Sequence, residues 1–296
     1  MKIFDKLKSY ISKENVNFTT ENDELVFKMI IEKVSDFHDY LPEIRNVGKH
    51  HYKIKETEDE ILRLIEDNPN VIRIQDDAGL NIGMHSAIPE LKNVVLRCLD
   101  DEVASTQQDH WNYNIGMHCA SKKYYQPYYK YSSYADMEEC ILKALDNEVA
   151  STQINRYGQN IGMISASNEF EEATLKALDN HKASIQRDSH GLNIGMHSAD
   201  KRLERAALKS LENEVASKQL NFYGADIGTI AATRGLKDVT IKALMNRENS
   251  KKRLNYGQTL EECAIKHNIV SSIEEIEELR SEYNENQGKN ESEMLE

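Results

Sequence analysis

Apolar residues recur at helical spacing in a segment that occurs four times along the chain. In MEECILKALDNEVASTQ (137–153) they include Ile141, Leu142, Ala144 and Leu145, which fall on one side of a helix with about 3.6 residues per turn. The related segments are LKNVVLRCLDDEVASTQ (91–107), FEEATLKALDNHKASIQ (170–186) and RLERAALKSLENEVASKQ (202–219). This pattern predicts an amphipathic helix in each copy.

A second recurring segment lies between the copies of the first. It is GLNIGMHSA at 79–87 and again at 191–199, with variants at 112–120, 158–166 and 224–232 and a weaker copy at 257–265. Its central glycines are Gly83, Gly116, Gly162, Gly195 and Gly228, so the spacings are 33, 46, 33 and 33 residues. The spacing of 46 equals 33 plus 13, which indicates one insertion in an array of 33-residue units.

Each of these second segments carries a helix start signal. One column holds residues that cap helix N-termini, namely Asn81, Asn114, Asn160, Asn193, Asp226 and Thr259. Two positions earlier stand residues that tolerate positive φ, namely Gly79, Asn112, Gly158, Gly191, Gly224 and Gly257. Each unit is therefore predicted to run turn, helix, short turn, helix, loop.

The stretch NFYGADIGTIAATRGLKDVTIKAL (221–244) resembles the ankyrin repeat, whose pattern is roughly D-x-x-G-x-T-P-L-H-x-A-A-x-x-G-h-x-x-V-V-x-x-L-L. Asn221, Gly224 and Asp226 take the places of the family's Asp, Gly and Thr. Four copies read N-I-G-M where the family has T-P-L-H, so the chain is similar to a variant subfamily. The resemblance covers about residues 57–280. It implies an all-α helix-turn-helix solenoid of about five to six repeats with a helical N-terminal cap, and protein binding in place of catalysis.

The two ends of the chain differ from the array. Helices are expected at Lys2–Ser12 and Asp23–His38, and capping boxes at Thr57-x-x-Glu60 and Ser272-x-x-Glu275. From 271 to 296 there are nine acidic and two basic residues, so we expect a capping helix followed by a disordered acidic tail. The predicted domains are a cap at 1–56, the array at 57–270 with its insertion at 122–134, and the terminal segment at 271–296.

Charge and composition narrow the partner classes. The 296 residues include 50 Asp and Glu against 37 Lys and Arg, a net charge of -13 that disfavours nucleic acid as a partner. The four cysteines are scattered, which is typical of reduced thiols in the cytosol. No apolar run is long enough for a signal peptide or a membrane span. We therefore expect a cytoplasmic protein without a membrane partner, and leave open its export as an effector by a signal-independent route.

Candidate chemical groups do not assemble into an enzyme or metal site in the sequence. His85, His118 and His197 share a column with Ile164, which suggested either a ladder of metal ligands or a core column that accepts histidine. Neighbouring helices lie about 8–10 Å apart, whereas zinc ligands lie about 2 Å from the metal, so the core interpretation is favoured. No nucleophile–base set is apparent. We expect no catalytic residues, no metal and no cofactor.

Aromatic residues gather at one position of the predicted turns. The candidate partner-binding residues are Trp111, Tyr157, His190, Tyr223 and Tyr256 in one column, with Tyr113 and Phe222 beside it. The ankyrin resemblance places these rings in an exposed row beside a concave face. They could stiffen the array by packing on the next turn, or bind a protein partner as large amphipathic anchors. We favour binding to a protein of unknown identity.

Other functions remain compatible with the same array. The chain could be an inhibitor or immunity protein that neutralises an enzyme or toxin, or a host-directed bacterial effector. A small-molecule or single-strand nucleic-acid binder is less favoured, because Arg156, Arg187 and Lys218 supply few cations.

The 13-residue insertion is rich in tyrosine. It contributes the candidate contact residues Tyr124, Tyr125, Tyr128, Tyr129, Tyr131 and Tyr134. Such content is typical of rigid, amphipathic contact loops, so the insertion is predicted to be a second contact site, with folding onto its own repeat as the alternative. Asp136 is predicted to cap the helix that follows, with Glu139 three residues on.

Overall fold

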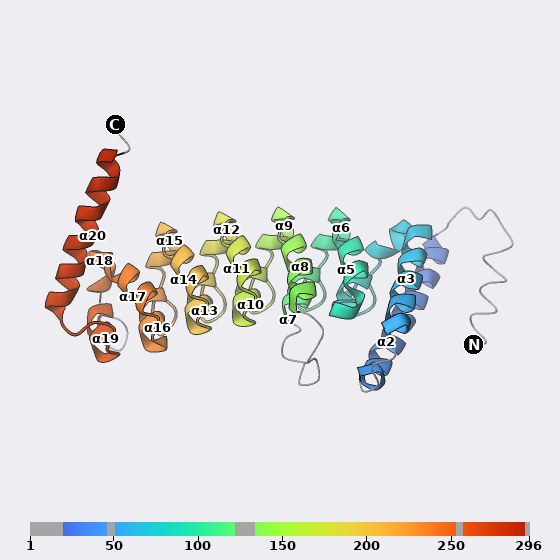
Figure 1. Cartoon of the computed structure of the whole chain (residues 1–296). Coiled ribbons are helices and arrows are strands. Elements are labelled where there is room, and N and C mark those ends of the chain that lie inside the picture. The colour runs from blue at the N-terminus through green and yellow to red at the C-terminus, as the bar shows by residue number, and fades with distance from the viewer. Residues whose placement is uncertain (1–19, 46–50, 122–133, 253–256, 294–296) are drawn as a thin grey trace.

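The protein is all-helical across the part of the chain that its computed structural model describes, which is residues 20–45, 51–121, 134–252 and 257–293. Successive helices pack side by side in an elongated row, with the N-terminal helices at one end and the C-terminal helix at the other (Figure 1). Within the described ranges, no helix has the length and apolar character needed to cross a bilayer.

Five units of the row contain three helices, where the sequence predicted two, and the last unit contains two. The first helices are α4 (Ile82–His85), α7 (Ile115–Ser121), α10 (Ile161–Ser167), α13 (Ile194–Asp200), α16 (Ile227–Arg234) and α19 (Leu260–Lys266). The second helices are α5 (Lys92–Leu99), α8 (Tyr134–Ala144), α11 (Glu171–Ala177), α14 (Glu204–Ser210), α17 (Lys237–Leu244) and α20 (Ile273–Glu293). The third helices are α6 (Glu102–Thr106), α9 (Glu148–Thr152), α12 (His181–Ile185), α15 (Glu214–Lys218) and α18 (Arg247–Ser250).

The third helix arises because a capping residue interrupts the apolar pattern. Asn147 follows α8, and its side chain accepts hydrogen bonds from the backbone N–H groups of Val149 and Ala150 at 3.0 and 3.1 Å. Asp101, Asn180 and Asn213 do the same in their units. Asn and Asp compete with the helical backbone in this way, so the chain turns and starts a new helix.

The predicted turns and first-helix caps are confirmed. Gly158 has a φ of 76° and Asn112 a φ of 62°, the left-handed region that their column was expected to need. The Asn160 side chain accepts a hydrogen bond from the Met163 N–H at 2.9 Å. The other five residues of the cap column accept equivalent bonds.

The glycine of the N-I-G-M segment permits a close approach of helices. A Cβ atom built on Gly162 would lie 2.6 Å from the Cβ of Ala177 and 2.6 Å from the Cδ1 of Ile194. These atoms belong to the second helix of the same unit and the first helix of the next. The recurring glycine therefore allows the close spacing of the helices in the row.

The N-terminal end is covered by long helices. α2 (Thr20–Arg45) contains the predicted Asp23–His38 helix, and α3 (His51–Asp67) precedes the short 3-10 helix η1 (Pro69–Arg73). A second 3-10 helix, η2 (Pro89–Leu91), precedes α5. The capping box predicted at Thr57 is wrong, because Thr57 lies inside α3 and Glu60 pairs instead with Lys33 at 2.8 Å. The predicted Lys2–Ser12 helix lies outside the described residues.

The C-terminal end is a single helix that projects from the row (Figure 1). Ser272 caps it, accepting a bond from the Glu275 N–H at 3.3 Å, as predicted. The Glu275 carboxylate bonds to Ser271, and not to Ser272 as a full capping box requires. α20 continues to Glu293, where the sequence predicted a disordered tail. Acidic residues in its first turn favour the helix through the macrodipole.

Candidate interaction surface

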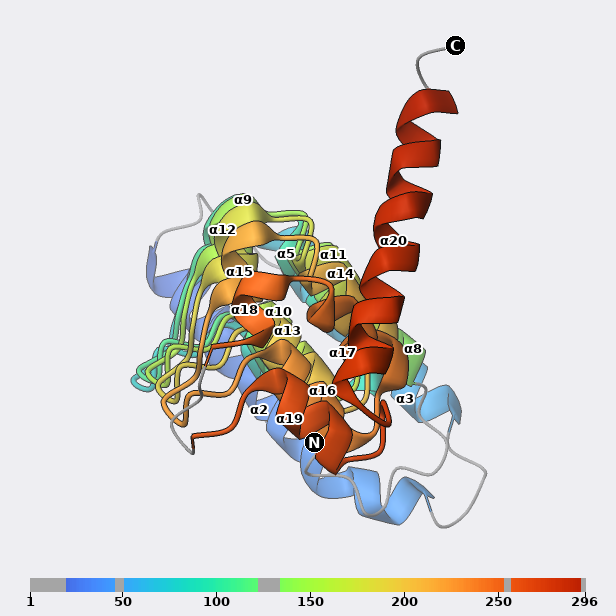
Figure 2. The ribbon, with the colours of Figure 1, turned by 90° about the vertical axis from the view of Figure 1, so that its left-hand side faces the viewer.

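The turns between one unit and the next form a rigid edge. They join each third helix to the following first helix and project together from one side of the row (Figure 2). Backbone hydrogen bonds connect neighbouring turns, such as Arg156 N–H to the Trp111 carbonyl at 3.1 Å and Ser189 N–H to the Tyr157 carbonyl at 2.7 Å. The next turn makes the same kind of bond, from the Phe222 N–H to the His190 carbonyl at 3.0 Å. Side chains at these turns are therefore held in fixed relation to one another.

Large aromatic side chains at these turns are exposed. The exposed fractions are 48% for Trp111, 43% for Tyr157, 66% for Phe222 and 57% for Tyr223, and His190 is exposed as well. Tyr113 is half-buried, with its ring 5.6 Å from that of His118. Tyr256 lies outside the described residues. Seven exposed residues of these turns are called the tip row below: Trp111, Arg156, Tyr157, Arg187, His190, Phe222 and Tyr223.

Arg156 joins two rings of the tip row. Its guanidinium carbon lies 3.0 Å from the centroid of the Trp111 ring and 4.8 Å from that of Tyr157. The guanidinium also donates to the Tyr157 hydroxyl at 2.5 Å. Cation–π contacts of this kind fix a long side chain that would otherwise sample many rotamers. The residue pattern does not indicate this stack, because the stack depends on two turns that are distant in the chain.

The tyrosine-rich insertion lies almost wholly outside the described residues. Tyr134 is the first residue of α8, so Asp136 stands in the first turn of that helix and does not cap it. The carboxylates of Asp136 and Glu139 instead each bind the Lys92 ammonium, at 2.9 Å. The predicted contact role of Tyr124, Tyr125, Tyr128, Tyr129 and Tyr131 stays a prediction.

The histidine column pairs with the turns. His118 Nε2 lies 2.9 Å from Asp109 Oδ2, and the same pair forms between His85 and Asp76 and between His197 and Asp188. Burial by itself would raise the pKa of Asp109, but hydrogen bonds from His118 and from backbone N–H groups hold that pKa below its usual value. Each pair thus clamps a turn onto its own first helix. Nowhere in the described residues do three His, Cys, Asp or Glu side chains gather as a metal site would require.

One of these pairs extends to a serine. Ser167 Oγ lies 3.0 Å from His197 Nδ1, and His197 Nε2 lies 3.0 Å from Asp188 Oδ2. The order Ser–His–Asp is that of hydrolytic triads, yet Ser167 is the last residue of α10, where helix carbonyls concentrate partial negative charge. An oxyanion needs the opposite environment, with N–H donors directed at it. The arrangement therefore fits a tie between neighbouring units.

The first and third helices differ in how much surface they expose. The third helices expose an apolar residue near their start, namely Val103, Val149 and Val215. The first helices α10 and α13 offer almost no surface, since all of each except its last residue is buried.

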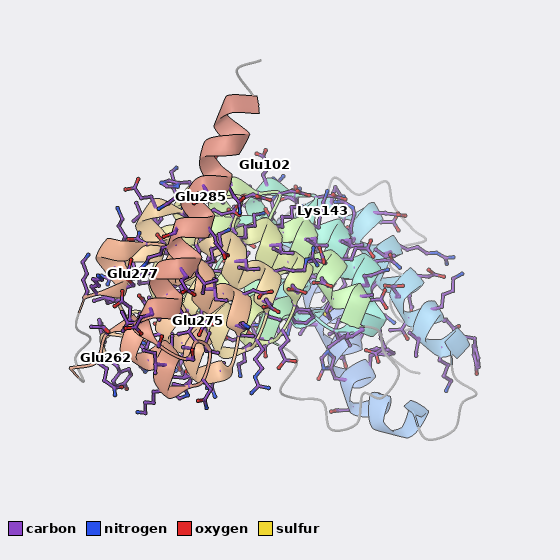
Figure 3. The ribbon with its side chains drawn as sticks, turned by 60° about the vertical axis from the view of Figure 1, so that its left-hand side comes forward. Glu102, Lys143, Glu262, Glu275, Glu277 and Glu285 are labelled. Atoms are coloured by element: carbon purple, nitrogen blue, oxygen red, sulfur yellow. The ribbon has the colours of Figure 1, made fainter. Side chains whose placement is uncertain are left out.

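The second helices present a different, ion-paired face. Lys143 binds Asp100 of the preceding unit at 2.9 Å, and Lys176 and Lys209 bind Asp146 and Asp179 at 2.6 Å. Figure 3 shows Lys143 on this face and acidic residues such as Glu275, Glu277 and Glu285 along α20. Such exposed pairs contribute little stability each, but they leave this face polar.

No model of a known protein family and no sequence of a characterised protein matches this chain. The tip row must therefore be interpreted from its own chemistry.

We expect Asp226→Asn to stabilise the protein at pH 7 and to have little effect near pH 4. Burial raises the pKa of Asp226, and the bonds from Thr229 offset only part of that rise. A raised carboxyl pKa means that the wild-type protein loses stability as pH climbs from about 4 towards the folded-state pKa. Asn keeps the cap without a charge, and four other units already use it. Urea unfolding at the two pH values measures the difference.

The control variant, Asp188→Asn, should change the stability at pH 7 in the opposite direction. The pKa of Asp188 is lowered, because bonds from His197 and backbone N–H groups outweigh the effect of burial. Its stabilisation is therefore present at pH 7 and lost as pH falls below about 4. Asp188→Asn should cost about 1 kcal/mol at pH 7. Equal signs for the two variants at pH 7 would contradict this account.

Proposed function

We propose that the chain is an ankyrin-like solenoid without catalytic activity, whose function is to bind another protein through the tip row. The observation that carries the proposal is the exposure of four large aromatic side chains on turns that backbone hydrogen bonds hold in register. Aromatic and arginine side chains are the common anchors of protein interfaces, and rigid anchors lose little entropy on binding.

The surroundings of the tip row support the same proposal. The helices α6, α9 and α15 each expose a valine as well. The second-helix face, by contrast, is covered with ion pairs between units. An apolar strip rimmed by polar residues is typical of a binding surface.

We expect the double variant Trp111→Ala, Tyr223→Ala to bind its partner at least about 100-fold more weakly, since truncating an interface hot spot costs about 2 kcal/mol or more. The partner would be captured with the full chain from the cells that express it, and its affinity measured by calorimetry. Circular dichroism would establish that the helices of the variant remain intact.

The matched control removes two exposed rings elsewhere. Tyr52 in α3 and Tyr283 in α20 are exposed to a similar degree and lie outside the tip row. The variant Tyr52→Ala, Tyr283→Ala should bind like the wild type. Unchanged affinity in the tip-row variant would overturn the proposed function.

A further inference from the structure

The tip row is locally cationic in a strongly acidic chain. The turns at 108–113, 154–159, 187–192 and 220–225 contain two acidic residues, Asp109 and Asp188. Both are buried, and their carboxylates already bind histidine and backbone N–H groups. The exposed charges of these turns are those of Arg156 and Arg187.

These two arginines lack a carboxylate partner within the described residues. Arg156 binds the Tyr157 hydroxyl, and Arg187 contacts the Leu220 carbonyl at 3.4 Å. Three other exposed arginines of the array do pair with a carboxylate, namely Arg73 with Asp101 at 2.8 Å, Arg205 with Glu172 at 2.7 Å and Arg234 with Asp200 at 2.5 Å, whereas Arg63 and Arg202 have no such partner among the described residues. The chain has an excess of 13 acidic residues, yet none of those that the structure describes pairs with Arg156 or Arg187.

The stack around Arg156 also determines what it can bind. The rings of Trp111 and Tyr157 lie within cation–π distance of the guanidinium, on which all N–H donors lie in one plane. With the ring contacts fixing its position, the donors at the guanidinium edge suit a planar carboxylate, which accepts two parallel hydrogen bonds.

We propose that the tip row binds an acidic segment of a partner polypeptide, with carboxylates at Arg156 and Arg187 and a large apolar side chain at Phe222 and Tyr223. This inference rests on the proposed function. Neighbouring units lie about 10 Å apart, which is roughly three residues of an extended chain. The segment therefore has two acids about three residues apart and an apolar residue about three further on. The net charge of the array does not prevent this, because physiological salt screens charges beyond about 8 Å.

The test uses a displayed library of random peptides of about twelve residues, selected on the immobilised full chain. We expect the selected peptides to be enriched in Glu and Asp together with a large apolar residue. Arg156→Gln and Arg187→Gln should each weaken their binding about tenfold, as should Glu→Gln in the peptide. Arg205→Gln, which removes an arginine from the second-helix face, should have no effect.

The outcomes separate the two proposals. One outcome is that the peptides lose binding in the Trp111→Ala, Tyr223→Ala variant but show no acidic enrichment, or bind both arginine variants as well as the wild type. That outcome would overturn this inference and leave the proposed function standing. Selected peptides that are all insensitive to the aromatic variant would overturn both. Tighter binding of a single-stranded oligothymidylate at the tip row would also overturn it, in favour of stacking on nucleic acid.

Discussion

Arg280→Met should destabilise the C-terminal end of the array by about 3–5 kcal/mol. Arg280 is 6% exposed and donates to the Leu244 carbonyl at 3.0 and 2.9 Å and to Ser250 Oγ at 2.6 Å. It also forms an ion pair with Glu261 at 2.8 Å, and the Glu261 side chain is only 9% exposed. Methionine would fill much of the space but remove the Arg280 donors from the Leu244 carbonyl, and leave the buried Glu261 carboxylate with the Ser250 hydroxyl at 3.2 Å in place of a cation.

The loss should be local, because the strong packing contacts of the described helices join neighbouring units. Hydrogen exchange would show faster exchange in α17 to α20, with α7 to α13 unaffected. Arg205→Met is the matched control: its partner Glu172 is exposed, so the change should stay within about 0.5 kcal/mol. The double variant Arg280→Met, Glu261→Leu should recover most of the loss, since an apolar pair replaces the buried ion pair. Equal losses of stability in the Arg280 and Arg205 variants would contradict the stabilising role of the buried Arg280 contacts.

Local features of the array could be predicted from the sequence. The cap column and the positive-φ column depend on single residues whose preferences are intrinsic, so Asn160 and Gly158 have the predicted roles. The third helix could also have been predicted. Asn147 followed by Glu148 is a helix start signal, but the apolar pattern on either side of it reads as one continuous helix.

The histidine pairs had a signal of their own. Where the turn residue is Asp109 or Asp188, the first helix carries His118 or His197 nine positions later. Where the turn residue is Asn155, the matching position is Ile164. The same holds for Asn221 and Ile230. Comparing the two columns between units would have revealed the pairing.

Side-chain contacts between neighbouring units could not be predicted. The stack of Trp111, Arg156 and Tyr157 spans the insertion, and the bond from Ser167 to His197 crosses two units. Each depends on the separation of turns in space, which periodicity does not specify. The candidate surface was therefore predicted as a column of rings, while its cationic character became visible only in three dimensions.

Asn160→Ala should destabilise the centre of the array by about 3 kcal/mol or more. Besides capping α10, the Asn160 amide donates to the Ala183 carbonyl at 2.9 Å and to Gln186 Oε1 at 2.7 Å. Gln186 in turn donates to the Thr152 carbonyl of the preceding unit at 2.8 Å. Alanine removes the cap, which costs about 1 kcal/mol, and leaves Gln186 Oε1 without a donor, which costs about 1–3 kcal/mol. It also leaves the Ala183 carbonyl with only the longer bond from the Gln186 N–H at 3.3 Å.

Thr259→Ala separates the cap from the rest of this network. Thr259 caps α19 by accepting from the Glu262 N–H at 3.1 Å, and this bond is exposed. Threonine has no side-chain amide, so it cannot make the bond that Asn160 donates to the Ala183 carbonyl. Its loss should cost about 1 kcal/mol in urea unfolding. The excess for Asn160→Ala then measures the Asn–Gln network, which recurs at Asn81, Asn114 and Asn193. An equal cost for both variants would mean that the caps alone hold the first helices. A larger cost for Asn160 would mean that the turns bearing the tip row are held in register by bonds between units.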